Sequence, residues 1–213
     1  MSYEPSTVEI CLTLGIGAII ALFYRSYVDT LPLQGNESVL DFGSGSGILS
    51  RHIAARLARG GGHLTCVDIS SRWMKVIQHT LRGFHNVTYR LGHITRIDLP
   101  EASFDTILTH FVLHDIPAAE RPLIVNTLAR KLKPGGRLIL REPQGHGLDL
   151  HELQALTTAA GLAAQDFEAH KVWLGPVYDG IFHKADLPQL VTPEISHSSD
   201  VFSINLIYTS DHS

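Results

Sequence analysis

Val39-Leu40-Asp41-Phe42-Gly43-Ser44-Gly45-Ser46-Gly47 is the stretch around which this chain is organised. A short apolar run ends in an acid, and three glycines follow at alternate positions. Residues 48–57 then place apolar side chains at 49, 53 and 57, which is the spacing of one helix face. A strand, a glycine turn and a helix in this order hold nucleotide-like ligands, because glycine lets backbone N–H groups approach and a helix N-terminus offers unpaired donors. We therefore expect the functional site where this strand ends.

Composition places the chain among soluble globular proteins. It has 213 residues, of which 44% are hydrophobic and 18% charged, so one domain with a real core is expected. The net charge of −4 argues against a nucleic-acid backbone as the main partner. Cys11 and Cys66 lie in apolar stretches and are predicted to be buried thiols. Nothing indicates an oxidising compartment, so a cytoplasmic location is expected.

An apolar run near the N-terminus, Ile10 to Tyr24, has two interpretations. It is shorter than the roughly 20 apolar residues that a membrane span needs, and no basic segment precedes it as in a secretory signal. We therefore predict no stable membrane span. The favoured interpretation is a buried helix that covers the domain. The alternative is a lid that turns Phe23, Tyr24 and Tyr27 towards a lipid-like substrate.

Strands and helices alternate along most of the chain. Strands are predicted at 38–42, 63–68, 86–91, 106–110, 137–141, 164–173 and 177–184, the last two pairing antiparallel. Helices are predicted at about 10–28, 47–58, 71–81 (N-capped by Ser70 or Ser71), 118–132 and 149–160, while residues 1–9 look loose. This predicts an α/β fold: a doubly wound, mostly parallel seven-stranded sheet with helices on both faces and an antiparallel last strand.

Three segments are expected along the chain. Residues 1–35 are an N-terminal helical cover and residues 36–185 are the ligand-binding domain. Residues 186–213 are a C-terminal tail, whose β-like run 201–208 could add one extra strand.

Asp41 and Asp68 end two successive strands, 27 positions apart. The carboxyl ends of parallel strands meet at one sheet edge, where doubly wound folds bind ligands. A carboxylate at the second position suits a ribose, because it accepts from two neighbouring hydroxyls. The alternative is that Asp68 merely caps the next helix. Ile48 stands where a dinucleotide fingerprint needs a small residue, which favours a ligand without a pyrophosphate.

The stretch 39–47 resembles motif I of the class I S-adenosylmethionine-dependent methyltransferases. Further segments resemble the family in order: 67–70 the ribose-binding acid, 92–107 the adenine loop with strand four, and 132–138 the turn before strand five. The resemblance covers residues 36–185 and is closest in style to small single-domain members that methylate quinones and other small molecules. It implies S-adenosylmethionine as cofactor and a small-molecule acceptor as partner.

The resemblance implies a role for each residue of the cofactor site. The implied cofactor-binding residues are Asp41, Gly43, Ser44, Gly45, Gly47, Asp68, Ile69, His93, Ile94 and His110. Asp41 would orient the turn and reach the ammonium group, Asp68 would hold the ribose, and Ile69 would pack on the adenine. His110 would offer its backbone carbonyl to the ammonium. His93 stands where the family usually carries an acid, so the backbone of Ile94 is the better candidate for adenine contacts.

Methyl transfer from a sulfonium is an in-line displacement that needs alignment, desolvation and, for some acceptors, a base. Candidate bases on the loops after the strands are His110, His114, Asp115, Glu142, His146 and His183, with His114, Asp115 and Glu142 as the catalytic group. Asp115 could instead be a helix N-cap, and Glu142 an exposed loop acid. No metal site is expected. His110 and His114 are four positions apart, but His110 ends a strand, so the spacing of a helix face does not apply, and no acid or cysteine stands at ligand spacing.

Two other functions stay open. A nicotinamide-dependent oxidoreductase is disfavoured by Ile48 and by Phe182, which stands where a Tyr-x-x-x-Lys pair starting at Tyr178 would need lysine. A non-catalytic S-adenosylmethionine-binding module is compatible with the same residues. Nucleic acid is not expected as a partner, and a homodimer is left open.

Overall fold

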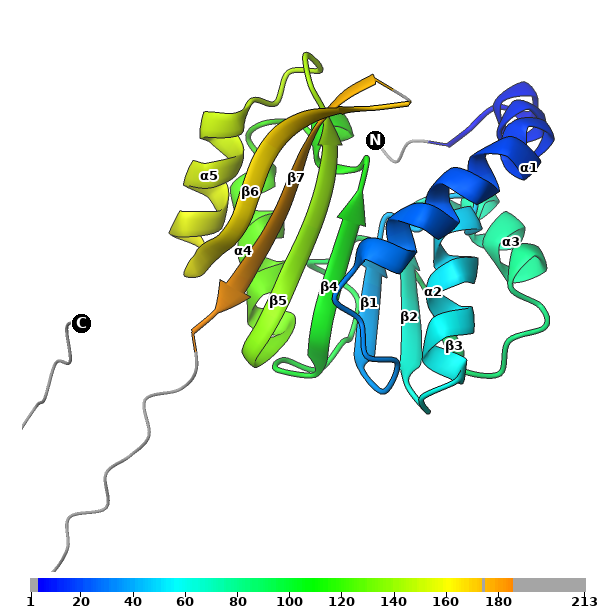
Figure 1. The fold of residues 1–213 in the computed structure, drawn as a ribbon, viewed down its shortest axis with the longest axis horizontal. Coiled ribbons are helices and arrows are strands. Elements are labelled where there is room, and N and C mark those ends of the chain that lie inside the picture. Colours follow the sequence, from blue (N-terminus) through cyan, green and yellow to red (C-terminus); the bar gives the residue numbers. More distant parts are fainter. Residues whose placement is uncertain (1–3, 174, 186–213) are drawn as a thin grey trace, which may run out of the picture.

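The computed structural model describes residues 4–173 and 175–185. One sheet of seven strands has the order β3-β2-β1-β4-β5-β7-β6, with helices on both faces (Figure 1). The elements are α1 (Thr7–Thr30), β1 (Ser38–Phe42), α2 (Ile48–Ala58), β2 (His63–Asp68), α3 (Ser71–Thr80), β3 (Val87–Leu91), β4 (Phe104–His110), a 3₁₀ turn (Leu113–Asp115), α4 (Arg121–Lys131), β5 (Leu132–Pro143), α5 (Leu150–Ala159), β6 (Leu162–Val172) and β7 (Gly175–Lys184).

The predicted fold class is confirmed. Strands β1 to β5 pair in parallel, and β7 lies antiparallel between β5 and β6. The carboxyl ends of β1, β2, β4 and β5 therefore share one edge, at the top of Figure 1. The order in which strands are added to the sheet reverses between β1 and β4, because β2 and β3 lie on one side of β1 while β4 and β5 lie on the other, and doubly wound sheets bind ligands at this point.

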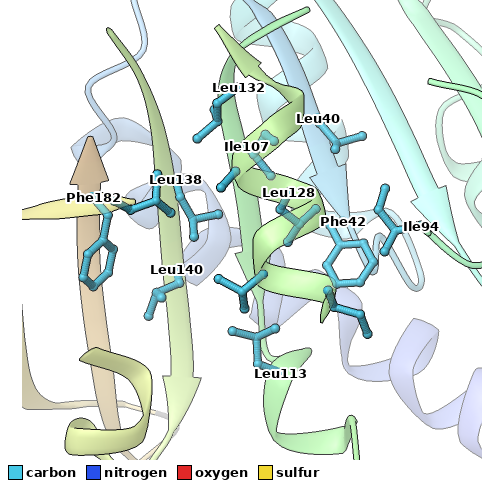
Figure 2. Close-up of a cluster of buried hydrophobic side chains, with 14 of the residues drawn as sticks. Leu40, Phe42, Ile94, Ile107, Leu113, Leu128, Leu132, Leu138, Leu140 and Phe182 are labelled. Carbon is cyan, nitrogen blue, oxygen red and sulfur yellow. The ribbon is translucent and has the colours of Figure 1, made fainter. Parts of the chain in front are cut away.

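Two apolar cores hold the sheet between its helices. Along β1, Leu40 and Phe42 face the core under α4 and α5, whereas Val39 faces the core under α1, α2 and α3. Figure 2 shows part of the first core, in which Phe42 lies beside Ile94. Each fully buried Leu or Phe side chain contributes about 1.5–3 kcal/mol, so these alternating residues stabilise the sheet from both faces.

The N-terminal helix differs from the favoured prediction. Tyr27 and Val28 at its end are buried, but Val8 and Leu22 are 68% and 71% exposed, so a wholly buried covering helix is wrong. Cys11 on the same helix is exposed, which also contradicts the prediction of a buried thiol, whereas Cys66 is buried as expected. Among residues 4–173 and 175–185, no helix combines the length and apolarity that a membrane crossing needs.

Residues 4–9 are not loose, because they fasten the chain to α3. The Glu4 carboxylate accepts from Ser70 Oγ at 2.7 Å, from Ser71 N–H at 2.9 Å and from Arg72 N–H at 3.2 Å. An acid at a helix N-terminus is favourable, and these hydrogen bonds lower the pKa of Glu4 to about 2. The predicted tail 186–213, with its β-like run 201–208, lies outside the described residues.

Two element boundaries also differ. Helix α4 begins at Arg121 rather than 118, after Glu120, and Asp115 lies in the 3₁₀ turn, so its suggested N-cap role is wrong. Strand β5 begins already at Leu132 and includes the predicted turn 133–136 as an irregularity. The loop between β4 and α4 is therefore longer than predicted, which leaves more chain above the carboxyl edge of the sheet.

Candidate functional site

The glycine turn after β1 leaves one side free for a ligand. Gly43, Gly45 and Gly47 have φ values of +74°, +50° and +75°, a region that favours glycine. A side-chain carbon on Gly43 would lie 2.5 Å from a methyl group of Val112, and one on Gly47 would lie 2.5 Å from Ile77. The same carbon on Gly45 would meet nothing closer than 3.9 Å. Gly43 and Gly47 are therefore required by packing, and the turn is open at Gly45.

Asp68 joins this turn to α3. Its Oδ2 accepts from Gly45 N–H and its Oδ1 accepts from Ser70 N–H, both at 2.8 Å. Ser70, one of the two predicted candidates, is the N-cap of α3, and Asp68 accepts a hydrogen bond from its backbone N–H. Each carboxylate oxygen keeps a second lone pair for a ligand hydroxyl. Burial raises the pKa of Asp68, although its backbone hydrogen bonds act in the opposite direction.

Asp41 lies buried below the turn, on the face of the sheet that carries α1 and α2. Ser50, in the first turn of α2, donates to Asp41 Oδ2. Burial raises the pKa of Asp41 to about 6, and the Ser50 hydrogen bond limits the rise. A carboxylate that is costly to ionise gains from a cationic partner, which is what the ammonium group of the expected cofactor supplies.

This pKa predicts a pH dependence of ligand binding. An acid whose pKa is raised in the folded protein takes up its proton early as pH falls, so a cation bound by ionised Asp41 is lost below about pH 6. We expect affinity for S-adenosylmethionine to increase between about pH 5 and 7 and the Asp41→Asn variant to bind weakly with a smaller pH dependence. Calorimetry at three pH values measures this, and equal affinities in the native chain would contradict it.

His110 ends β4 between aromatic side chains of α1. Its ring lies 5.1 Å from that of Tyr24 and 5.3 Å from that of Tyr27, measured between centroids. Burial, together with the nearby Arg141 charge, lowers the pKa of His110 to about 3. Its Nε2 is buried and has no hydrogen-bond partner within the described part of the chain. Such a weakly basic ring is a poor general base, so the expected role for His110 remains its backbone carbonyl.

The predicted adenine loop is split between the core and the surface. Ile94 packs into the core beside Phe42, so only its backbone is available to a ligand (Figure 2). His93 Nδ1 forms a hydrogen bond with Thr95 Oγ1 at 2.8 Å, and His93 Nε2 lies 3.7 Å from Glu120 Oε2. Ile69, next to Asp68, is 40% exposed, as an apolar surface for a ring would be.

Glu142 is the residue whose surroundings differ most from expectation. It is fully buried near the end of β5, so its interpretation as an exposed loop acid is wrong. Its Oε1 accepts from Val112 N–H at 3.1 Å and from Leu113 N–H at 2.9 Å. Its Oε2 bonds His114 Nδ1 at 2.8 Å. Glu142 thus fixes the 3₁₀ turn after β4 and orients the imidazole of His114.

His114 is held between two acids. Burial alone would lower its pKa, but the hydrogen bond and charge of Glu142, together with the charge of Asp115, raise the pKa above its ordinary value. Asp115 Oδ1 lies 3.4 Å from His114 Nε2, and the Asp115 side chain is 79% exposed. Asp115, the predicted partner of His114, therefore makes only an exposed contact with it, whereas Glu142 makes a buried hydrogen bond.

A cavity of about 240 Å³ opens beside this histidine. Its walls are formed by Phe111, His114, Pro143, Gln144, His146, Gly175, Pro176 and Val177. The His146 ring lies 5.7 Å from that of His114. Gln144 fastens the loop after β5 to β7, since its side chain donates to Val177 O at 2.8 Å. Two imidazoles and one amide are the polar groups of an otherwise apolar wall.

His183 is placed far from this site. Because β7 runs antiparallel, its last residues pair with the start of β5, and His183 lies opposite Arg137 at the other edge of the sheet. Its suggestion as a base above the sheet is therefore wrong. Within residues 4–173 and 175–185, no three His, Cys, Asp or Glu side chains are grouped to hold a metal ion.

Three residues of the site were not predicted from sequence. Ser50 supports Asp41, and Val112 packs on Gly43. Arg121 is 4% exposed and donates to Ile116 O, Gly147 O and Glu152, which ties the loops after β4 and β5 to α5. A charged side chain in the first turn of a helix gives no local indication that it is buried, so only the fold reveals this clamp.

Comparisons with known proteins agree on one family. The family model described as a methyltransferase domain matches residues 39–136. The demethylmenaquinone methyltransferase of Tropheryma whipplei (strain Twist) is 38% identical over 118 residues, which is 55% of this chain and 46% of that protein. The ubiquinone/menaquinone biosynthesis C-methyltransferase of Vibrio parahaemolyticus is 27% identical over 165 residues, 73% of this chain and 62% of that protein. The chain thus spans about half to two thirds of the length of these curated relatives.

Solved structures extend the likeness to the fold. A TehB-like S-adenosylmethionine-dependent methyltransferase from Corynebacterium glutamicum has a TM-score of 0.67 at 16% identity, covering 84% of this chain and 100% of that one. An S-adenosylmethionine-dependent methyltransferase from Aquifex aeolicus has a TM-score of 0.64 at 17% identity, covering 75% of this chain and 88% of that one. At these identities the likeness concerns the fold alone.

Proposed function

We propose that the chain is a class I S-adenosylmethionine-dependent methyltransferase that transfers a methyl group to a small, apolar acceptor. The match of residues 39–136 to a methyltransferase-domain model and the two partial relatives support this proposal. The observation that carries the proposal is the glycine turn, open at Gly45 between the carboxylates of Asp41 and Asp68. When bound, S-adenosylmethionine supplies an electrophilic methyl carbon with a neutral thioether as leaving group.

The residues present fit this cofactor. The open side of the turn lets a ligand approach the backbone of Gly45. Asp68 has lone pairs left for two ribose hydroxyls. Asp41 offers a buried negative charge to the ammonium group. Two buried polar atoms at the end of β4 without protein partners in the described residues, Thr109 Oγ1 and His110 Nε2, are free for hydrogen bonds from a ligand or water. We propose these groups, with Gly43, Ser44, Ile69 and the backbone of Ile94, as the cofactor site.

The chain's own contribution to catalysis is alignment, exclusion of water and removal of a proton where the acceptor carries one. Phe111, Pro143 and Val177 form an apolar wall beside His114, against which a bound acceptor ring would displace water. Two relatives are named for quinone methylation, which supports an acceptor with an apolar ring. The exposed apolar side chains of α1 fit the same acceptor class, because a hydrophobic substrate approaches along apolar surface.

Two measurements test the proposal: binding of S-adenosylmethionine, and release of S-adenosylhomocysteine as the product. We expect calorimetry to show heat with S-adenosylmethionine and none with NAD, because Ile48 replaces the small residue of a dinucleotide turn. Heat with NAD alone would refute the proposal. Release of S-adenosylhomocysteine with an acceptor panel of quinols, phenols and amines then separates an enzyme from a module that only binds the cofactor.

A further inference from the structure

The contacts of Glu142 select one chemical form of His114. A buried carboxylate 2.8 Å from Nδ1 accepts a hydrogen bond only if Nδ1 carries the proton. The neutral imidazole then has its free lone pair on Nε2, on the side of the ring away from Glu142. Since Glu142 also accepts from Val112 and Leu113 N–H, neither the acid nor the turn that carries His114 is free to rotate away.

The free nitrogen is available to a ligand. His114 is part of the cavity wall, and its Nε2 lies 3.4 Å from Oδ1 of Asp115, whose side chain is 79% exposed. This contact is an ion pair only when the imidazole is protonated, and the unprotonated Nε2 gives the Asp115 carboxylate no hydrogen bond, so an acceptor hydroxyl or water displaces Asp115 at low cost. His114 therefore has one nitrogen held by a buried acid and the other turned to an exchangeable partner.

The size and walls of the cavity limit what it takes. An apolar cavity of roughly 150 Å³ accommodates benzene, so about 240 Å³ has room for one substituted ring. Phe111, Pro143, Pro176 and Val177 supply flat apolar walls. The imidazoles of His114 and His146 and the amide of Gln144 supply the polar groups of the wall.

We propose that His114, oriented by Glu142, accepts the proton of an acidic ring hydroxyl seated in this cavity. Nε2 forms a bond to the proton, the O–H bond breaks, and the oxygen keeps the electron pair as a phenolate-type anion. Glu142 is a positioning residue, because it acts through the imidazole. The inference rests on the proposed function only for the fate of this anion, and the proton transfer itself needs no cofactor.

Several charged groups face the imidazole and set its basicity. Glu142 and Asp115 raise its pKa, whereas burial and the Arg121 guanidinium lower it. His146 faces it from the loop after β5. Because the net effect raises the pKa, His114 is a stronger base than an ordinary histidine, and it becomes free to accept a proton only as pH rises through that raised pKa.

The test uses the full chain without cofactor and 3-nitrophenol as probe, because its phenolate absorbs visible light and its phenol does not, and because it is a weak enough acid to be studied above pH 7, where His114 can be unprotonated. At a pH about one unit below the pKa of the free probe, roughly a tenth is ionised in solution. We expect more than half of the bound probe to be ionised, about a fivefold rise. 3-Nitroanisole, which has no proton to give, measures occupancy of the cavity by competition.

Three variants separate the roles. His114→Gln should still bind 3-nitroanisole and lose the rise in phenolate. Glu142→Gln should reduce the rise and move its pH midpoint to lower pH, since the carboxylate no longer supports the imidazolium; a fold role alone would not move that midpoint. His183→Gln, at the opposite edge of the sheet, is the matched control and should behave as the native chain.

The outcomes distinguish this inference from the proposed function. If S-adenosylmethionine binds but the probe stays ionised as in solution, the proton-accepting role is refuted and the methyltransferase proposal stands. If S-adenosylmethionine does not bind, the proposed function fails, and the phenolate signal still decides on His114. A phenolate rise that persists in His114→Gln refutes the assignment whatever the cofactor does, even if Glu142→Gln proves too unstable to measure.

Discussion

Replacing Gly43 by alanine is expected to destabilise the chain by about 2–5 kcal/mol and to abolish cofactor binding. The added carbon would lie 2.5 and 2.7 Å from the two methyl groups of Val112, a short, branched side chain that has no easy alternative position. Overpacking of this kind costs about 1–3 kcal/mol. The φ of +74° adds about 1–2 kcal/mol for any residue other than glycine.

Gly45→Ala is the matched control for this change. It has the same kind of backbone strain, at φ +50°, but its added carbon meets nothing within 3.9 Å. We expect about 1–2 kcal/mol of lost stability, from strain alone, together with weaker cofactor binding because the methyl group points into the open side of the turn. Thermal unfolding separates the two variants, since 1 kcal/mol corresponds to about 2–4 °C for a chain of this length.

A double variant identifies the cause. Adding Val112→Ala to Gly43→Ala removes the methyl groups that collide, so part of the lost stability should return, beyond what the two single variants predict when summed. Equal stability of Gly43→Ala and Gly45→Ala, or strict additivity in the double variant, would contradict the packing argument.

Features of the site that depend on residues close together in the chain were predicted well from the sequence, unlike the contact between Gly43 and Val112. The strand, the glycine turn, the acid at Asp68 and the Ser70 cap depend on residues close together in the chain, and each lies where the pattern indicated. The alternation of strands and helices led to the correct sheet because each element buries one face. Residues whose role depends on a partner far along the chain were not predictable in this way.

Glu142 and Glu4 are examples of such long-range partners. Glu142 meets His114 across 28 positions, and Glu4 meets Ser70 across 66. In the sequence each is an acid at the end of an apolar or loose stretch, and such an acid is more often exposed. The alternative that Asp115 is a helix N-cap failed for the same reason, because Glu142 binds the backbone of that segment and holds it in a 3₁₀ turn.

His183 was misplaced for a different reason, since the information was present in the sequence. The last two strands were predicted to pair antiparallel, and an antiparallel last strand must end at the edge opposite the glycine turn. His183, one residue before the end of the predicted strand, therefore belonged at the far edge, where the structure has it. Topology constrains where a side chain can act even before any contact is known.

The second large effect is expected at Asp68. Asp68→Ala should weaken binding of S-adenosylmethionine by about 1–3 kcal/mol, roughly 5- to 150-fold, through loss of charged hydrogen bonds to the ribose. The same change leaves the N–H groups of Gly45 and Ser70 without their acceptor, so the turn and the start of α3 should also loosen. Asp68→Asn is no mild substitute, because its amide nitrogen would face one of these two donors.

Calorimetry on the folded variants separates loss of binding from loss of stability. Asp98→Ala is the matched control, because Asp98 is an exposed acid on the nearby loop and its removal should leave affinity unchanged. An Asp68→Ala variant that binds S-adenosylmethionine as tightly as the native chain would refute the ribose assignment. A variant that loses affinity but keeps its unfolding temperature would show that Asp68 acts on the ligand directly, whereas a joint loss would show that its hold on Gly45 and Ser70 shapes the site first.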